Sequence, residues 1–370
     1  MAAVLRTYRA DPGAGVNPLR TPQPGSVRVM VIDDSLTVRT VFSRMIDREP
    51  DLAIVAQSAT AEQALMILRS TQVDVVLLDL EMPGMGGLEA LPEILKTARG
   101  AQVLVVSSLT TDGAEATLSA LQMGAADTML KPRPGGFNED YRGSLLSKIR
   151  ALGGKAQPAA PPSPIALPRQ HCPAPKRPRV IAIGASTGGI HALNLFLRRL
   201  PAQLDLPILI TQHLPESFIP VFARQMETAA NREAVLGDEG VKIVPRRIIV
   251  APGHGHLVVR KIQGEIVTGL AHHPVKSGCR PSVDPMFETL ADAYEGEVAA
   301  VLLSGMGRDG TEGAQRIAAM GGGIYAQDQA SSAVWGMPRA VAESGLACAV
   351  SPPERLADRV AAAAGVATWR

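Results

Sequence analysis

Three side chains that together could activate a hydroxyl group follow separate apolar segments in the second half of the chain. Ser186 follows the segment Val180–Ala185, His213 follows an apolar run at 208–211, and Asp309 lies in the glycine-rich stretch 304–310. A histidine can take the proton of a serine hydroxyl, and an aspartate can fix the tautomer of that histidine. The set predicts nucleophilic acyl chemistry if the fold brings the three residues together.

The turn around Ser186, Gly184-Ala-Ser-Thr-Gly-Gly189, fits two uses when it is taken alone: a phosphate cradle or a turn that presents a nucleophile. Its Gly-x-x-x-Gly-Gly spacing differs from the Gly-x-Gly-x-x-Gly of dinucleotide sites, and the next strand ends in Gln212-His213 instead of an acidic ribose ligand. The presence of His213 and Asp309 favours the second use, a turn that presents Ser186 as a nucleophile. Taken singly, the three residues also fit a helix cap, a packed histidine and a turn residue.

A second group of reactive residues lies in the first half of the chain. Asp33, Asp34 and Asp79 close two expected strands, and Lys131 closes a third. Carboxylates that share one crevice repel one another and need a cation, and oxygen donors suit Mg²⁺. The alternative is that each aspartate only caps the helix that follows it.

Apolar strands and amphipathic helices alternate along the whole chain, which predicts an α/β fold with parallel sheets. The first half has five strand–helix units and predicts a five-stranded, flavodoxin-like domain. Its expected strands are 27–32, 52–55, 73–78, 103–106 and 128–130, and its expected helices are 38–46, 61–69, 87–97, 113–122 and 139–151. The second half predicts a doubly wound α/β domain. Its expected strands are 180–183, 208–211, 247–250, 298–303 and 323–326, with a hairpin over 258–267 and helices at 190–199, 217–230, 285–294, 311–320 and 337–344.

The length of 370 residues and the change in composition predict two domains with a linker between them. We expect a disordered tail at 1–25, a first domain at 26–152, a linker at 153–178 and a catalytic domain at 179–370. The linker holds eight prolines and has almost no periodic apolar pattern.

Charge and hydropathy exclude several classes of partner. With 37 basic and 35 acidic residues and 3% aromatic residues, the chain is not expected to bind nucleic acid. Since no apolar run reaches about 18 residues, membrane insertion is not expected. The N-terminal stretch has no apolar core of a signal peptide, so a cytoplasmic location is expected.

Residues 26–150 resemble the receiver domain of two-component response regulators. The matching pieces are Val-Ile-Asp33-Asp34-Ser, Leu-Leu-Asp79-Leu-Glu-Met-Pro-Gly-Met, Val-Val-Ser107-Ser and Leu-Lys131-Pro. The resemblance implies that Asp79 accepts a phosphoryl group from a histidine kinase. It also implies that Asp34, Asp79 and the Glu81 carbonyl hold Mg²⁺, that Asp33 acts through water, and that Ser107 and Lys131 bind phosphoryl oxygens. Gly86 and Thr128 depart from the family pattern, Thr128 at a common aromatic switch position.

Residues 179–365 resemble the catalytic domain of the CheB family of chemotaxis protein-glutamate methylesterases. The matching motifs are Gly184-Ala-Ser-Thr-Gly-Gly, Thr211-Gln-His-Leu-Pro, Ala251-Pro-Gly, Arg280-Pro-Ser-Val-Asp, Ser304-Gly-Met-Gly-Arg-Asp-Gly and Trp335-Gly-Met-Pro-Arg. The resemblance implies phosphorylation-activated hydrolysis of glutamate γ-methyl esters on methyl-accepting chemotaxis receptors, with deamidation of receptor glutamines. Ser186, His213 and Asp309 would be catalytic, and the site would need no cofactor.

In that domain the Thr187 and Met306 backbone N–H groups are candidates for an oxyanion hole, because glycine-rich turns leave such groups free. Arg280, Ser282, His256 and Arg339 are expected to rim the cleft. Other classes stay open: a DNA-binding regulator, a non-catalytic adaptor, and an esterase acting on receptors outside flagellar chemotaxis. The large α/β second half speaks against the DNA-binding regulator, and the Ser-His-Asp set speaks against the adaptor.

Overall fold

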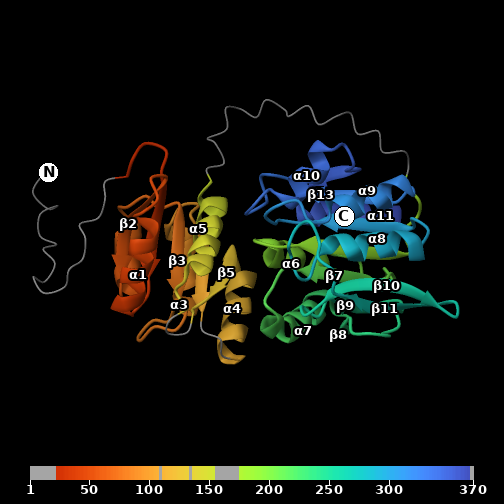
Figure 1. The fold of residues 1–370 in the computed structure, drawn as a ribbon, viewed down its shortest axis with the longest axis horizontal. Coiled ribbons are helices and arrows are strands. Elements are labelled where there is room, and N and C mark those ends of the chain that lie inside the picture. Colours follow the sequence, from red (N-terminus) through yellow and green to blue (C-terminus); the bar gives the residue numbers. More distant parts are fainter. Residues whose placement is uncertain (1–21, 108–110, 133–135, 155–174, 367–370) are drawn as a thin grey trace, which may run out of the picture.

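Two parallel β-sheets, each flanked by helices, organise the two halves of the chain (Figure 1). The computed structural model describes residues 22–107, 111–132, 136–154 and 175–366. Most of the tail expected at 1–25 and of the linker expected at 153–178 therefore lies outside the described residues, as does Ser108.

The first half contains a five-stranded parallel sheet in the order β2-β1-β3-β4-β5, as the sequence predicts. The strands are β1 (Val27–Ile32), β2 (Leu52–Ser58), β3 (Val75–Asp79), β4 (Gln102–Ser107) and β5 (Asp127–Leu130). The helices are α1 (Leu36–Ile46), α2 (Ala61–Leu68), α3 (Gly87–Thr97), α4 (Thr111–Met123) and α5 (Glu139–Gly153). The strand order reverses between β1 and β3, so the residues that follow these strands share the crevice where open α/β sheets bind ligands.

The second half contains a seven-stranded parallel sheet in the order β14-β13-β12-β6-β7-β9-β8. Its strands are β6 (Val180–Ala185), β7 (Ile208–Gln212), β8 (Ala234–Leu236), β9 (Ile248–Val250), β12 (Val298–Leu302), β13 (Gly323–Gln327) and β14 (Ala349–Ser351). Its helices are α6 (Gly189–Arg199), α7 (Ile219–Ala230), α8 (Val283–Ala293), α9 (Thr311–Ala319), α10 (Met337–Glu343) and α11 (Pro353–Ala363). The order reverses between β6 and β12, which places the ends of these strands at a second ligand crevice.

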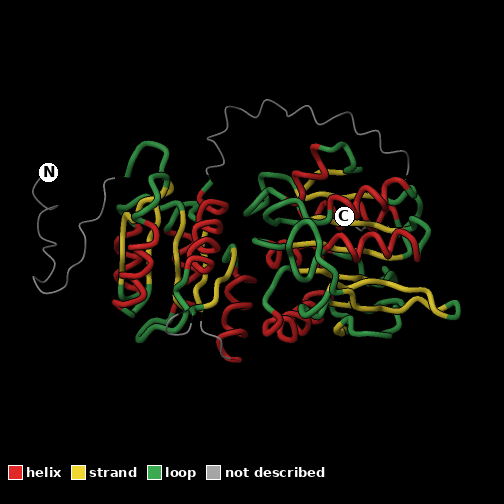
Figure 2. The backbone as a smooth tube through the Cα atoms, viewed as in Figure 1, coloured by secondary structure: helices red, strands yellow, loops and turns green. Residues whose placement is uncertain are grey.

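A separate antiparallel hairpin, β10 (His256–Ile262) with β11 (Glu265–Ala271), confirms the expected hairpin across Gln263-Gly264 (Figure 2). Both turn residues have positive φ angles, 50° and 85°, as a two-residue hairpin turn requires.

Burial explains why most predicted elements form and why a few were missed. The central strands β1, β3, β6, β7 and β12 are apolar runs that are largely buried, as in sheets covered on both faces. Three elements were not predicted: β8 and β14, which have only three residues each, and α11, which buries Leu356 and Val360 beside smaller residues.

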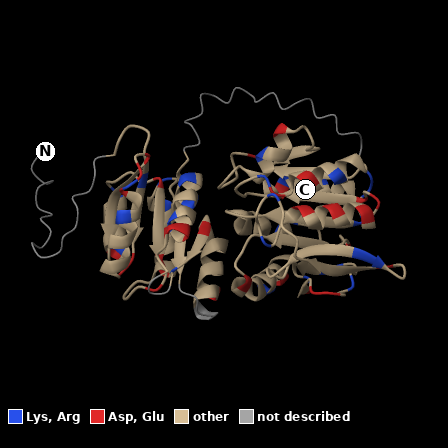
Figure 3. Cartoon of the chain, viewed as in Figure 1, with Lys and Arg blue, Asp and Glu red and all other residues tan. Residues whose placement is uncertain are grey.

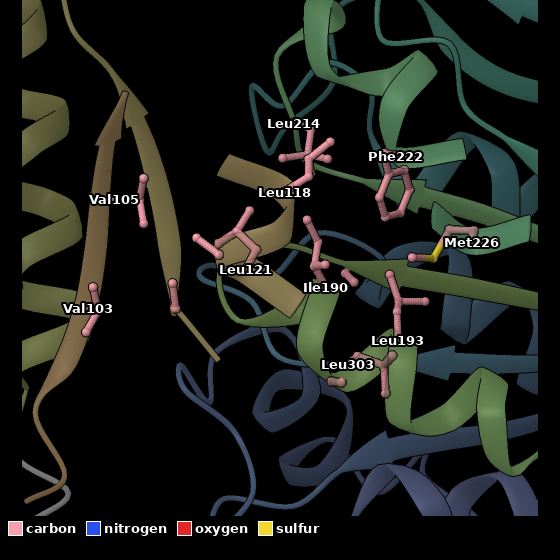
Figure 4. Packing of buried hydrophobic residues seen from close by; sticks show 14 of the residues in the cluster. Val103, Val105, Leu118, Leu121, Ile190, Leu193, Leu214, Phe222, Met226 and Leu303 are labelled. Atoms are coloured by element: carbon pink, nitrogen blue, oxygen red, sulfur yellow. The ribbon is translucent and has the colours of Figure 1, made fainter. Parts of the chain in front are cut away.

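The two halves pack directly against each other through α4 and α6 (Figure 4). Leu118 and Leu121 of α4 lie in one continuous buried cluster with Ile190 of α6 and with Leu214. Leu118 is fully buried. Burying such side chains contributes about 1.5–3 kcal/mol each, so the contact has apolar surface enough to hold the halves together.

Charged residues of both signs are interspersed over both halves (Figure 3). Several form surface pairs, such as Arg199 with Asp358 at 2.8 Å. Among the helices of the described ranges, none combines the length and the apolarity that crossing a membrane requires.

Candidate active site and phosphoryl pocket

Ser186 lies in the turn between β6 and α6, beside the end of β12. Its backbone N–H donates to the Ser304 carbonyl over 3.0 Å. Three glycines make this tight turn possible. A Cβ at Gly184 would lie 2.6 Å from a Val283 methyl carbon, and one at Gly188, where φ is 76°, would lie 2.5 Å from the Ala333 Cβ. Larger residues would therefore push the turn away from α8 and from the segment that carries Ala333.

His213 and Asp309 form a direct pair next to this turn. His213 Nε2 donates to Asp309 Oδ2 over 2.8 Å. Because Ala185 pairs with Gln212 in the sheet, Ser186 and His213 are the next residues of adjacent strands, and the His213 N–H donates to the Ala185 carbonyl. With Nε2 directed at Asp309, the ring nitrogen left for Ser186 is Nδ1. No hydrogen bond links Ser186 Oγ to His213 in this arrangement of the described residues.

A buried chain of hydrogen bonds holds Asp309. Ser282 Oγ donates to Asp309 Oδ1 over 2.6 Å, and the Val283 N–H donates to Oδ2 over 2.7 Å. The Ser282 N–H in turn donates to His256 Nδ1 over 3.0 Å. Ser282 and His256 are 0% and 2% exposed, so the expectation that they rim the cleft is wrong; Arg280 and Arg339 are exposed. Ser282 and His256 face inward because the Arg280-Pro-Ser-Val-Asp loop runs beneath Asp309.

The electrostatics of the pair follow from this geometry. Burial disfavours the imidazolium, but the hydrogen bonds and charges of Asp309 and Cys279 outweigh burial and raise the pKa of His213 to about 9. Burial also opposes ionisation of Asp309, yet the hydrogen bond and charge of His213 lower its pKa to about 2. A carboxylate that orients a catalytic base must be ionised, and the lowered pKa of Asp309 meets this requirement.

Thr187 and Met306, whose N–H groups were expected to form an oxyanion hole, both touch the first half of the chain. Thr187 Oγ1 donates to Asp127 Oδ2 over 2.6 Å, and the neighbouring Gly188 N–H donates to the Ala126 carbonyl over 2.5 Å. The Met306 sulfur accepts a long contact of 3.9 Å from Ser147 Oγ of α5. The start of β5 therefore lies directly against the turn that carries Ser186.

In the first half, the structure gathers the expected acidic cluster at the crevice between β1 and β3. Carboxylate oxygens of Asp33, Asp34 and Asp79 all lie within 4.8 Å of one another. Lys131 Nζ lies 2.6 Å from Asp79 Oδ2 and 3.0 Å from Asp33 Oδ2. Three carboxylates facing one ammonium form an oxygen-only donor set with excess negative charge, which fits a hard divalent cation.

Ser107 and Glu81 also lie close to this acidic cluster. The Lys131 N–H donates to the Ser107 carbonyl over 2.7 Å, which brings the two expected phosphoryl-binding residues together. Ser107 Oγ is buried and has no hydrogen-bond partner among the described residues. Burial raises the pKa of Asp79 to about 6 even though Lys131 opposes the shift. The Glu81 N–H donates to Asp79 Oδ1 over 3.1 Å.

Three further residues near the sites were not predicted from the sequence. Gln212 Nε2 donates to the Ser186 carbonyl over 2.8 Å, and its place just before His213 could have signalled this role. Cys279 has a sulfur within 4.8 Å of both His213 and Asp309. Asp127 pairs with Lys148 and Thr187. No sequence signal marks Cys279 or Asp127, because each contact depends on how a loop or a domain packs.

Comparison with known proteins gives matches to both halves. Residues 181–360 match the family model described as CheB methylesterase, and residues 29–136 match the response regulator receiver domain. The receiver match implies a divalent-metal-dependent phosphorylation by a phosphodonor kinase. The solved CheB methylesterase catalytic domain of Thermotoga maritima is 31% identical, covers 50% of this chain and 97% of that chain, and has a TM-score of 0.48.

Two curated relatives match over nearly the full length. The protein-glutamate methylesterase/protein-glutamine glutaminase 1 of Paramagnetospirillum magneticum is 40% identical over 91% of this chain and 96% of its own. The corresponding protein 2 of Caulobacter vibrioides is 43% identical over 91% of this chain and 99% of its own. At this identity and coverage, the chain belongs to the family of protein-glutamate methylesterase/protein-glutamine glutaminases.

Proposed function

We propose that the chain hydrolyses γ-methyl esters of glutamates on methyl-accepting chemotaxis receptors and releases methanol, under the control of phosphorylation at Asp79. The observation that carries this proposal is the His213–Asp309 pair at the strand end next to Ser186. The substrate side chains belong to the cytoplasmic part of such receptors, so we propose that the enzyme acts in the cytoplasm. Measuring methanol released from a methylated receptor tests the activity.

In the proposed reaction, Ser186 Oγ attacks the ester carbonyl while His213 Nδ1 takes the hydroxyl proton. Asp309 holds the other ring nitrogen and stabilises the imidazolium. The Thr187 and Met306 N–H groups stabilise the oxyanion. The imidazolium then gives its proton to the departing methoxide, and water hydrolyses the acyl-enzyme with His213 again acting as the base. On a receptor glutamine the same steps release ammonia.

In the first domain, Asp79 would accept the phosphoryl group from a chemotaxis histidine kinase. The chemistry of the acidic cluster fits Mg²⁺ held by Asp34, Asp79 and the Glu81 carbonyl, with Asp33 acting through water. When bound, Mg²⁺ supplies positive charge that offsets the charge on the transferring group. Lys131 and the Ser107 hydroxyl, which has no hydrogen-bond partner among the described residues, would bind the phosphoryl oxygens.

The contact between the domains supports a regulatory role for the receiver. Ala126 and Asp127 hydrogen-bond to the Gly188 amide and the Thr187 hydroxyl, next to the proposed oxyanion hole. Since these contacts lie beside Ser186, we infer that they hinder a receptor helix from reaching it. Phosphorylation at Asp79 would shift the equilibrium towards a state in which the receiver leaves this turn.

The pH dependence of the reaction follows from the raised pKa of His213. The ring must be neutral to accept the serine proton, and with a pKa of about 9 it is mostly protonated at pH 7. We therefore expect kcat/KM for methanol release to rise from pH 7 to about 9 and to level off above it. Replacing Asp309 by Asn removes the acceptor charge. In this variant the midpoint of the kcat/KM profile should move to lower pH, and the high-pH value of kcat/KM should drop roughly 10³–10⁴-fold. A wild-type midpoint below pH 7 would contradict this assignment.

Breaking the contact of Asp127 should activate the unphosphorylated enzyme. Asp127 accepts hydrogen bonds from Thr187 and Lys148, and a hydrogen bond to a charged group is worth about 1.5–3 kcal/mol. We expect Asp127→Ala to raise methanol release without phosphodonor about tenfold. The matched control is Glu115→Ala, which removes the exposed interdomain pair with Arg224 at 3.0 Å and should change the rate by about twofold or less. Equal effects of the two variants would rule out the Asp127 contact as the restraint.

A further inference from the structure

The catalytic pair has a third neighbour that the proposed reaction does not use, the thiol of Cys279. We propose that His213, Cys279 and Asp309 form a binding site for a borderline-soft divalent cation such as Zn²⁺, and that the bound ion inhibits ester hydrolysis. The site itself goes beyond the proposed function. Its inhibitory effect rests on the role of His213 as the base.

The geometry of the three donors is close to that of a zinc site. One ring nitrogen, the sulfur and one carboxylate oxygen all lie within 4.8 Å of one another. In tetrahedral zinc sites the metal bonds are about 2.0–2.3 Å long, which puts neighbouring donor atoms about 3.5 Å apart. Side-chain movements of an ångström or less therefore suffice to surround an ion. Three protein donors leave the fourth position for water, as in open zinc sites.

The donor chemistry selects the metal. Imidazole, thiolate and carboxylate together favour Zn²⁺, whereas oxygen-only sets favour Mg²⁺. The receiver cluster of Asp33, Asp34 and Asp79 is of the second kind. The same chain thus presents two cation sites of different preference, and excess Mg²⁺ occupies one without competing strongly for the other.

The thiol is free and can be reached. Cys279 is a free cysteine and is partly buried. Its sulfur makes a long contact of 3.8 Å with the Ser277 carbonyl and also interacts with the His213 ring. A cavity of about 520 Å³ is lined by Cys279 and Asp309, together with the charged residues Asp284, Glu312, Lys276 and Arg308. Because Lys276 pairs with Glu312 over 2.5 Å, the cavity supplies an open path to the three donors, not a strongly acidic funnel.

The surrounding contacts fix the carboxylate as metal sites require. Ser282 Oγ and the Val283 N–H donate to Asp309, so its orientation is set before any ion arrives. An ion seated among the donors would take the ring nitrogen that now faces Asp309 and would add positive charge beside it. His213 could then no longer accept the serine proton with Asp309 as its partner, and hydrolysis would stop until the ion leaves.

The test uses the full chain in excess Mg²⁺, with Co²⁺ as a spectroscopic probe. We expect Co²⁺ to produce a thiolate charge-transfer band in the near ultraviolet, which Zn²⁺ removes by displacement. Cys279→Ser should lose the band and bind Zn²⁺ at least about tenfold more weakly. A missing band, or an equal band in Cys279→Ser, would overturn the site.

Methanol release by the same samples tests inhibition separately. Each protein is normalised to its own activity in a chelator that prefers Zn²⁺ to Mg²⁺, which shows that ester hydrolysis itself is intact. Zn²⁺ should inhibit the wild type reversibly, and Cys279→Ser should need at least about tenfold more Zn²⁺ for the same inhibition. If the band forms while Zn²⁺ leaves methanol release unchanged, the site exists but its inhibitory role is wrong; a variant His213→Ala that keeps a near-normal rate would instead refute His213 as the base.

Discussion

Replacing Ser186 by alanine should lower kcat for methanol release by roughly 10⁵-fold or more. The alanine has no hydroxyl to form the acyl-enzyme, and the His213–Asp309 pair has nothing to activate. His213→Ala should cost a similar factor, because residues that act as a unit lose most of their effect together. The rate is measured on methylated receptor in the presence of a small phosphodonor and Mg²⁺, so that the receiver does not limit access.

The control for Ser186→Ala is Ser217→Ala, an exposed serine in the short 3₁₀ turn before α7. A surface change of this kind alters stability by about 0.5 kcal/mol or less, so the rate should stay within about twofold. Circular dichroism should show that all variants fold alike. A near-normal rate for Ser186→Ala would refute the serine mechanism.

Replacing Asp79 by asparagine should abolish stimulation by the phosphodonor. In the wild type we expect stimulation of at least about tenfold, because the receiver contributes to the closed state a charged hydrogen bond worth about 1.5–3 kcal/mol as well as apolar contact. An amide cannot form the acyl phosphate, so the variant should keep the basal rate with or without phosphodonor and Mg²⁺. Methanol release under the two conditions measures the ratio directly.

Asp140→Asn provides the control for Asp79→Asn, since Asp140 is an exposed carboxylate in the first turn of α5, outside the acidic cluster. It should retain the full stimulation. If Asp79→Asn were stimulated as strongly as the wild type, the phosphoryl group would act elsewhere on the chain.

Much of the fold follows from local sequence patterns. Buried strands such as β1 and β6 are continuous apolar runs, and α3 (Gly87–Thr97) was predicted with its observed ends. The missed elements lack such a signal. β8 and β14 have three residues each and lie at the two edges of the sheet, and α11 has only Leu356 and Val360 as large buried apolar residues, which gives a weak periodic signal.

The site residues could be predicted to the extent that they follow strands. Ser186, His213 and Asp79 stand at or directly after the carboxyl ends of parallel strands, where side chains converge whatever the loops do. The burial of Ser282 and His256 and the approach of Cys279 depend on the path of the loop between β11 and α8. The contact of Asp127 with Thr187 depends on how two domains dock. Neither the path of this loop nor the docking of the domains leaves a short-range pattern in the sequence.

The most direct single measurement is the rate at which a serine-directed acylating probe labels Ser186 in the full chain, with and without a small phosphodonor and Mg²⁺. The receiver hydrogen-bonds to Thr187 and Gly188 in this structure, so we expect slow labelling at first and labelling at least about tenfold faster after phosphorylation. Asp79→Asn should label slowly in both conditions. Equal labelling rates in the wild type, or labelling of a serine other than Ser186, would contradict the proposal that phosphorylation of the receiver exposes an esterase nucleophile.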